Sequence, residues 1–190
     1  MKLMIIWGSS RTARKSGPLI DWVKGRTEAY KRFEVDLVDL KELNLPFYDE
    51  PMGPYSLAKS GTGYSNPQGK TWAERVGRSD AVIIVTPEYN HGPSAVLKNA
   101  LDWVGPEWKD KPVGLISYGG VSGGIRAVEQ LRSITIELGL INVANAIHFQ
   151  FFSKCFDEQG KLVSKETFNP QLEAMFDEIE RLHSAFHKSS

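Results

Sequence analysis

The sequence predicts an α/β protein in which five parallel strands form a doubly wound sheet with helices on both faces. Apolar runs of strand length recur along the chain, and segments with apolar residues at helical spacing separate them. One run, residues 81–85, is apolar throughout, as expected of a strand that is covered on both faces of a parallel sheet. A chain of 190 residues has the length of one domain, so we assign residues 1–190 to a single domain.

The first elements follow from apolar spacing and from the residues that end each run. A strand is predicted over residues 3–7. The helix that follows has apolar residues about every 3.6 positions; Ser16 can cap it, and Pro18 suits its first turn, where no N–H donor is needed. Residues 33–37 alternate between polar and apolar side chains, which indicates a half-exposed strand. Residues 44–70, rich in Gly, Pro, Ser and Tyr, predict a long surface loop.

The second half of the chain repeats this alternation up to an amphipathic C-terminal helix. Apolar periodicity and glycine turns place its elements, with an irregular connection at residues 150–168. In order, we expect a short helix near 72–76, the strand at 81–85, a helix over 94–103, a strand at 113–116, a helix ending before Gly139, a fifth strand at 140–147 interrupted by Asn142 and Asn145, and a last helix at about 170–187.

Composition excludes several classes of protein. Lys and Arg total 23 and Asp and Glu total 23, so the absence of net charge disfavours binding to nucleic acid through a general basic field. No apolar run approaches the ~18 residues of a membrane span, and the N-terminal apolar stretch is too short for a secretory signal. The single Cys155 cannot form an internal disulfide, and His91 has no second histidine at ligand spacing. We therefore expect a cytoplasmic protein without metal, membrane or nucleic-acid contacts.

The loop after the first strand, residues 8–17, has the composition of a phosphate site. It combines hydroxyls, free backbone N–H groups and the N-terminus of a helix with the cations Arg11, Arg14 and Lys15. A phosphate dianion is bound by donors of this kind. The alternative is a solvated capping loop whose cations point into water.

Two further loops follow the third and fourth strands, and the carboxyl ends of parallel strands meet at one edge of the sheet. In residues 86–94, Pro87 and Pro93 restrict the backbone, and Tyr89 offers a flat face to a planar heterocycle. A stiff turn with an incidentally exposed tyrosine is the alternative. Glycines in residues 117–124 permit a close approach of backbone and ligand.

The glycine-rich loop also matches the nucleophile elbow of serine hydrolases. Gly120-Val121-Ser122-Gly123-Gly124 fits the pattern G-x-S-x-G between a predicted strand and a predicted helix. Asp157 and then His183 or His187 follow in the chain order of the catalytic triad. A serine hydrolase is therefore an alternative function.

Taken together, the three loops resemble those of the NADPH-dependent FMN reductase family, which includes flavodoxin-like quinone, azo-dye and chromate reductases. The resemblance covers about residues 1–150. It rests on Gly8-Ser9-x-Arg11 with Ser16, on Pro87-Glu88-Tyr89-Asn90 followed by Lys98-Asn99-Ala100-Leu101-Asp102-Trp103, and on Ser117 with the Gly119-Gly120 turn. The Pro-Glu-Tyr-Asn segment and the helix after it are the specific part.

The resemblance implies a flavodoxin-like fold and an enzyme that passes electrons from NADPH or NADH through bound FMN to a small acceptor, such as a quinone, a flavin, an azo compound or a metal oxyanion. It implies that Ser9, Arg11 and Ser16 hold the FMN phosphate with Gly17 beside them, that Pro87, Glu88, Tyr89 and Asn90 line the flavin ring, and that Ser117, Gly119 and Gly120 close its other side. Because a flavin performs hydride chemistry itself, no catalytic acid, base or nucleophile is required of the protein.

Two further expectations concern rival function and assembly. A flavodoxin-type electron carrier would share the fold without turnover, but such carriers are strongly acidic and this chain is neutral. Members of the family are typically homodimers, sometimes tetramers. The helix over residues 94–103 has apolar residues on more than one face, so we expect it at a subunit contact; cover by residues 44–70 of the same chain is the monomeric alternative.

Overall fold

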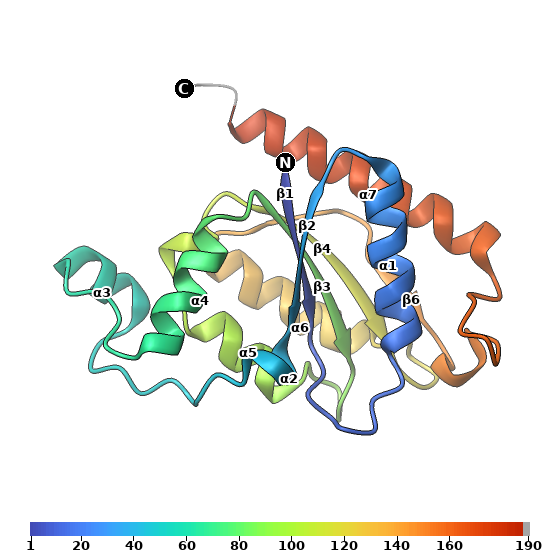
Figure 1. Ribbon diagram of the computed structural model, residues 1–190, viewed down its shortest axis with the longest axis horizontal. Helices are drawn as coiled ribbons and strands as arrows, with labels where there is room; N and C mark the ends of the chain where they lie inside the picture. Colours follow the sequence, from blue (N-terminus) through green and yellow to red (C-terminus); the bar gives the residue numbers. More distant parts are fainter. Residues whose placement is uncertain (188–190) are drawn as a thin grey trace.

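The computed structural model describes residues 1–187 and contains a central parallel sheet (Figure 1). The sheet has the order β2-β1-β3-β4-β5, and a further strand, β6, also pairs with β4. The strands are β1 (Lys2–Trp7), β2 (Glu34–Asp39), β3 (Ala81–Pro87), β4 (Pro112–Tyr118), β5 (Ile141–Asn142) and β6 (Ile147–Phe149). The predicted doubly wound, flavodoxin-like fold is confirmed, since this is the flavodoxin strand order.

The fifth position of the sheet holds two short strands, β5 and β6, where the sequence predicted one interrupted strand. Between β5 and β6, side chains form hydrogen bonds with the backbone. The guanidinium of Arg132 donates to the carbonyls of Val143 and Ala144 at 3.2 and 2.9 Å, and the N–H of Ala144 donates to the carboxylate of Glu178 at 3.2 Å. These bonds satisfy backbone groups of the segment that separates β5 from β6.

Helices cover both faces of the sheet (Figure 1). Helices α1 (Gly17–Tyr30) and α7 (Lys165–Phe186) pack on one face, and α4 (Pro67–Gly77), α5 (Ala95–Asp102) and α6 (Ile125–Glu137) pack on the other. Alternate side chains of β1 therefore enter different cores: Leu3 and Ile5 lie under α1 and α7, while Met4 and Ile6 lie under α4 and α5. Burying each such side chain stabilises the fold by about 1.5–3 kcal/mol.

Two helices begin earlier than the sequence predicts. Helix α4 begins at Pro67 because the side chain of Asn66 accepts hydrogen bonds from the N–H groups of Gln68 and Gly69 at 2.9 and 3.1 Å. Helix α7 begins at Lys165, before the predicted start at about residue 170, and contains Pro170. In the turn before that proline, the ring of Phe168 stacks on the ring of Phe149, with centroids 4.2 Å apart.

The stretch at residues 44–70, expected as a long loop, contains a helix, α3 (Pro54–Ser60), and follows the short helix α2 (Leu40–Leu43). It is fastened to α5. Asn99 accepts from the N–H of Tyr48 at 3.2 Å and donates to the carbonyl of Pro46 at 2.8 Å, while the indole of Trp103 donates to the same carbonyl at 2.7 Å.

This attachment overturns the argument that placed the helix at residues 94–103 in a subunit contact. Trp103 and Val104 are buried within one chain, and the Tyr48 ring packs against Trp103 with centroids 5.0 Å apart. The second apolar face of α5 is thus covered by residues 44–70 of the same chain, as the monomeric alternative supposed. The oligomeric state itself stays a prediction.

Short 3₁₀ turns, η1 (Pro106–Trp108) and η2 (Phe152–Lys154), complete the connections. Within residues 1–187, no helix has both the length and the apolar character that a membrane crossing requires. The cytoplasmic location and the assignment of residues 1–190 to one domain stay predictions.

Gly69 on α4 offers a test of the packing between α4 and α5. An added Cβ there would lie 2.2 Å from a ring carbon of Trp103, so Gly69→Ala should destabilise the protein by about 1–3 kcal/mol despite the better helix propensity of alanine. Gly77→Ala on the same helix is the matched control, because its nearest neighbour would be 3.9 Å away. Urea unfolding of both variants measures the difference; equal midpoints would contradict the packing described.

Candidate active site

The carboxyl edge of the sheet contains a reversal of strand order at β1, which has β2 on one side and β3 on the other. Connections from β1 and β3 diverge there, and ligands bind at such points in open α/β sheets. Gly8 holds the two strands together: its N–H donates to the carbonyl of Val85 at 2.8 Å, and a Cβ at this position would lie 2.9 Å from that oxygen. Any larger residue would push the strands apart.

A cavity of about 260 Å³, here called the edge cavity, opens at this point. Its walls come from all three loops that the sequence singled out, together with one residue of η2: Ser9, Arg11, Ala13, Arg14, Lys15, Pro87, Glu88, Tyr89, Tyr118, Gly119 and Phe152. The expectation that the three loops lie together at one edge is therefore confirmed.

The loop between β1 and α1 forms the polar end of the edge cavity. Within residues 1–187, the backbone N–H groups of residues 10–13 donate no hydrogen bond to another backbone group. Arg11 and Lys15 line the cavity, and both are exposed. Unpaired amides beside two cations form a site for an anion such as a phosphate group.

Arg14 holds this loop in place and is not available as a ligand for an anion. Its guanidinium lies 3.5 Å from the ring centroid of Trp7, forms an ion pair with Asp39 at the end of β2, and donates to the carbonyl of Ser9 at 2.5 Å. Burial raises the pKa of Asp39, but the hydrogen bonds from Arg14 and from the N–H of Lys41 outweigh it and hold that pKa below its usual value.

Ser16 occupies the N-cap position of α1 without capping the helix, so that part of the prediction is wrong. Its hydroxyl accepts instead from the indole of Trp7 at 2.8 Å and from the hydroxyl of Tyr118 at 3.1 Å. Ser16 is fully buried behind the edge cavity. Burial also raises the pKa of Tyr118, which therefore keeps its proton and donates.

The loop after β3 forms a tight two-residue turn. The N–H of Tyr89 donates to the carbonyl of Gly92 at 2.9 Å, and the N–H of Gly92 donates back at 3.1 Å. Asn90 and His91 between them have φ of 49° and 72°, the left-handed pair of a type I′ turn. The turn presents Tyr89 to the cavity, where its hydroxyl lies 3.3 Å from that of Ser9.

Glu88 joins the second loop to the third. Its carboxylate forms an ion pair with Arg126, accepts from the hydroxyl of Ser122 at 3.1 Å and accepts from the N–H of Arg126 at 3.1 Å. Its side chain is only 6% exposed. Burial raises the pKa of Glu88, but the bonds from Arg126 and Ser122 outweigh that effect and keep the pKa below its usual value.

The third loop supplies backbone and a buried hydroxyl. The hydroxyl of Ser117 donates to the carbonyl of Gly123 at 2.8 Å and lies 2.8 Å from Nδ1 of His148, with its side chain fully buried. A Cβ at Gly119 would lie 3.3 Å from the nitrogen of Gly124, which is a tight contact. A Cβ at Gly120 would meet no atom within 4 Å, so the structure leaves room for a side chain there.

The residues that the sequence singled out thus divide into two groups. Those that line the edge cavity are Ser9, Arg11, Pro87, Glu88, Tyr89 and Gly119; those outside the lining are Ser16, Gly17, Asn90, Ser117 and Gly120. Arg14 and Lys15, which the sequence named only as cations of the first loop, also line the cavity. Lining residues that were missed are Ala13, Tyr118 and Phe152, of which Tyr118 could have been found from its place at the end of β4.

The structure does not bring together the catalytic triad of a serine hydrolase. Ser122 bonds to Glu88 and Arg126 rather than to a histidine. His183 lies in a surface groove with Met1, at the opposite edge of the sheet, and Asp157 accepts from N–H groups of its own turn. Within residues 1–187, no cluster of three potential metal ligands is present.

Comparison with known proteins shows several relatives. NAD(P)H-dependent FMN reductase LOT6 of Saccharomyces cerevisiae is 32% identical over 189 residues, which cover 96% of this chain and 94% of the relative. NADPH:quinone oxidoreductase of Arabidopsis thaliana is 32% identical over 148 residues, covering 74% of this chain and 70% of the relative.

Among solved structures, the flavoenzyme NAD(P)H:(acceptor) oxidoreductase FerB from Paracoccus denitrificans has the same fold. Its TM-score is 0.73 at 23% identity, and the match covers 95% of this chain and 97% of FerB. The family model described as NADPH-dependent FMN reductase matches residues 1–153, which contain all three loops of the edge cavity. On these grounds, the chain belongs to the NADPH-dependent FMN reductase family.

Proposed function

We propose that this protein is an FMN-containing oxidoreductase that passes electrons from NAD(P)H to a small acceptor, such as a quinone, a flavin, an azo compound or a metal oxyanion. The observation that carries the proposal is the edge cavity, which has an anion site at one end and flat side chains at the other. The activities of the relatives, an FMN reductase and a quinone oxidoreductase, support the same donor and acceptor classes.

The residues present fit FMN at both ends of the cavity. Open amides of residues 10–13, with Arg11 and Lys15, are donors suited to a phosphate dianion. Tyr118 and Phe152, with ring centroids 4.6 Å apart and ring planes tilted by 38°, form an aromatic wall, and Tyr89 and Pro87 line the same cavity. Bound FMN would supply the hydride chemistry, and the protein would bind it, orient it and exclude water.

We assign roles to the chain's own residues on this basis. Arg11, Lys15 and the nearby amides bind the phosphate, and Ser9 donates from the same loop. Ser16, buried behind the cavity, positions Trp7 and Tyr118. Glu88 positions the second and third loops through its bonds with Arg126 and Ser122, and the ion pair with Arg126 balances the negative charge of Glu88. Pro87, Tyr89 and Gly119 border the ring, with Asn90, Ser117 and Gly120 supporting the loops and Gly17 the first turn of α1.

The direct test is the visible spectrum of the purified protein after incubation with FMN and gel filtration, followed by turnover with NADPH and a quinone. We expect retained flavin bands and steady oxidation of NADPH. Retained flavin without turnover would support the electron-carrier alternative instead. Absence of flavin, together with cleavage of an activated ester that Ser122→Ala abolishes, would support the hydrolase.

Arg11 should contribute to FMN affinity without contributing to stability. Because its side chain is exposed at the anion site, Arg11→Ala should weaken FMN binding by about 1.5–3 kcal/mol, the range for a hydrogen bond to a charged group, at an unchanged melting temperature. Arg78→Ala, an exposed arginine after α4, is the matched control. Titration of the apo-protein with FMN measures the dissociation constant of each variant. If Arg11→Ala and the wild type have equal dissociation constants for FMN, Arg11 points into solvent.

We also propose that the protein forms a homodimer or homotetramer, through a surface other than the one first expected. Val121 is 70% exposed and Phe151 is 52% exposed, and the N–H of Phe151 donates to the carbonyl of Gly120 at 2.8 Å. With Ile125, these residues form an apolar rim beside the edge cavity, and exposed apolar patches commonly mark interfaces.

This assembly is tested by light scattering during size exclusion. We expect a mass of at least twice 21.3 kDa, reduced to the monomer mass by Val121→Asp. Val163→Asp is the control, since Val163 is an exposed valine in the irregular connection before α7. A wild-type mass of 21.3 kDa at micromolar concentration would contradict the proposal.

A further inference from the structure

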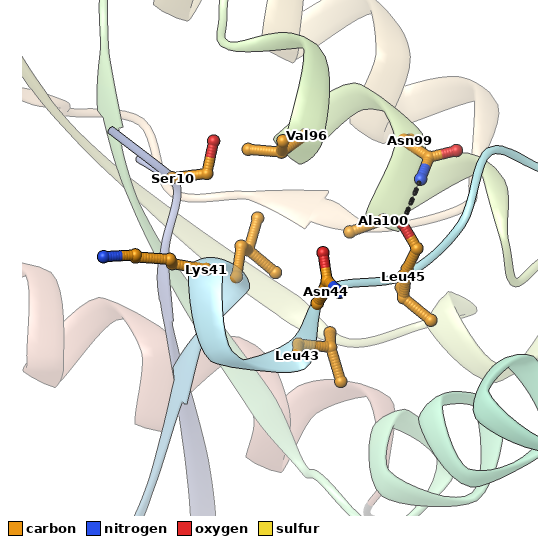
Figure 2. A pocket seen from close by; sticks show the side chains of 9 residues that line it. Ser10, Lys41, Leu43, Asn44, Leu45, Val96, Asn99 and Ala100 are labelled. Carbon is orange, nitrogen blue, oxygen red and sulfur yellow. Dashed lines mark hydrogen bonds between the residues drawn. The ribbon is translucent and has the colours of Figure 1, made fainter. Parts of the chain in front are cut away.

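A second cavity lies on the other side of the first loop, between α2 and α5 (Figure 2). This α2–α5 cavity has a volume of about 190 Å³ and is lined by Ser10, Leu40, Lys41, Leu43, Asn44, Leu45, Val96, Asn99 and Ala100. In Figure 2, Ser10 and Lys41 lie at one side of it, and Asn44, Leu45 and Asn99 lie at the other.

Consecutive residues of one loop line the two cavities. Ser9 and Arg11 line the edge cavity, whereas Ser10 between them lines the α2–α5 cavity. The volume of the α2–α5 cavity, about 190 Å³, is below the roughly 300–1,000 Å³ of a site that encloses a whole drug-sized ligand. This cavity therefore suits one end of an extended ligand whose other end lies across the loop, beside the edge cavity.

Lys41 supplies a cation to the lining of the α2–α5 cavity. Among residues 1–187, Lys41 forms no ion pair, in contrast with Arg14 on the first loop, which is held by Asp39. The FMN phosphate in the proposed function already has Arg11 and Lys15 on the other side of the loop. Lys41, together with the hydroxyl of Ser10, therefore remains available to a second phosphate group.

The rest of the cavity suits a planar heterocycle. Leu43, Leu45 and Val96 are apolar and partly exposed at its walls. Asn99 is fixed by its bonds to Tyr48 and Pro46, so that wall is rigid. Asn44, exposed and in a left-handed conformation, puts an amide with both a donor and an acceptor at the rim.

We propose that the α2–α5 cavity takes the adenosine end of NADPH and that Lys41 and Ser10 bind its 2′-phosphate. Lys41 is then the residue that makes the chain prefer NADPH to NADH, because the 2′-phosphate is the only chemical difference between the two donors. This inference rests on the proposed function, since it assumes that the nicotinamide end of the same molecule meets FMN at the edge cavity.

The first experiment measures binding without turnover. Calorimetric titration of the FMN-loaded protein compares adenosine 2′,5′-bisphosphate with AMP, which lacks the 2′-phosphate. We expect the bisphosphate to bind at least about tenfold more tightly, and Lys41→Met to remove most of that difference, because a charge-assisted hydrogen bond is lost. Lys70→Met, which removes an exposed lysine of α4, should leave the difference intact.

The second experiment uses turnover with both donors. Lys41→Met should lower the ratio of kcat/KM for NADPH to that for NADH by about tenfold, with the dissociation constant of FMN unchanged. Val96→Phe, which fills the cavity, should raise KM for both donors alike.

Two results would overturn the inference: equal affinities for the bisphosphate and AMP in the wild type, or a Lys41→Met variant in which the donor ratio is unchanged. A protein that fails to retain FMN or to oxidise either donor contradicts the proposed function instead. In that case the nucleotide titration, done on the protein as purified, still reports on the cavity.

Discussion

The guanidinium of Arg14 is the contact on which the arrangement of the carboxyl edge depends. The loop from Gly8 to Ser16 has no regular secondary structure of its own, so its shape must come from contacts with its surroundings. Arg14 stacks on Trp7 at the end of β1, pairs with Asp39 at the end of β2 and bonds to the carbonyl of Ser9. One side chain thus fixes the loop to two neighbouring strands and leaves the amides of residues 10–13 free.

The sheet makes this edge rigid enough to hold such a loop. β1 pairs with β3 over residues 3–7 and 81–85, which are almost all buried, and Gly8 allows the two strands to stay in register at the point where their connections part. Local hydrogen bonds then complete the walls of the edge cavity. A type I′ turn presents Tyr89, and the buried carboxylate of Glu88 joins that turn to the start of α6. The edge cavity is therefore formed by loops that local hydrogen bonds hold in place on the paired strands β1 and β3.

The sequence predicted the parts of the fold that depend on local periodicity. Strands such as residues 81–85 could be recognised because every position is apolar, whereas the division of the fifth strand depends on Arg132 and Glu178, which come from distant helices. Helix α3 was missed because its seven residues, Pro54–Ser60, are too few to show a periodic pattern. Sequence spacing likewise could not show that Trp103 would be buried by contacts with Pro46 and Tyr48.

The same distinction applies to the candidate site. The three loops could be identified because each follows a strand, but the division of labour among Arg11, Arg14 and Lys15 could not, since it depends on the positions of Trp7 and Asp39. Ser16 looked like a helix cap for the same reason: its neighbours in sequence suit a cap, and Tyr118, which binds it, is far along the chain.

The alternation of Ser9, Ser10 and Arg11 between two cavities has a thermodynamic consequence. Peptide bonds join the three residues, so a ligand that draws the loop toward one cavity also moves the wall of the other. If occupancy of one cavity changes affinity at the other by some factor, linkage requires the reverse effect to have the same size. Any such coupling would pass through this loop, and the contacts of Arg14 with Asp39 and with the carbonyl of Ser9 oppose the displacement that it requires.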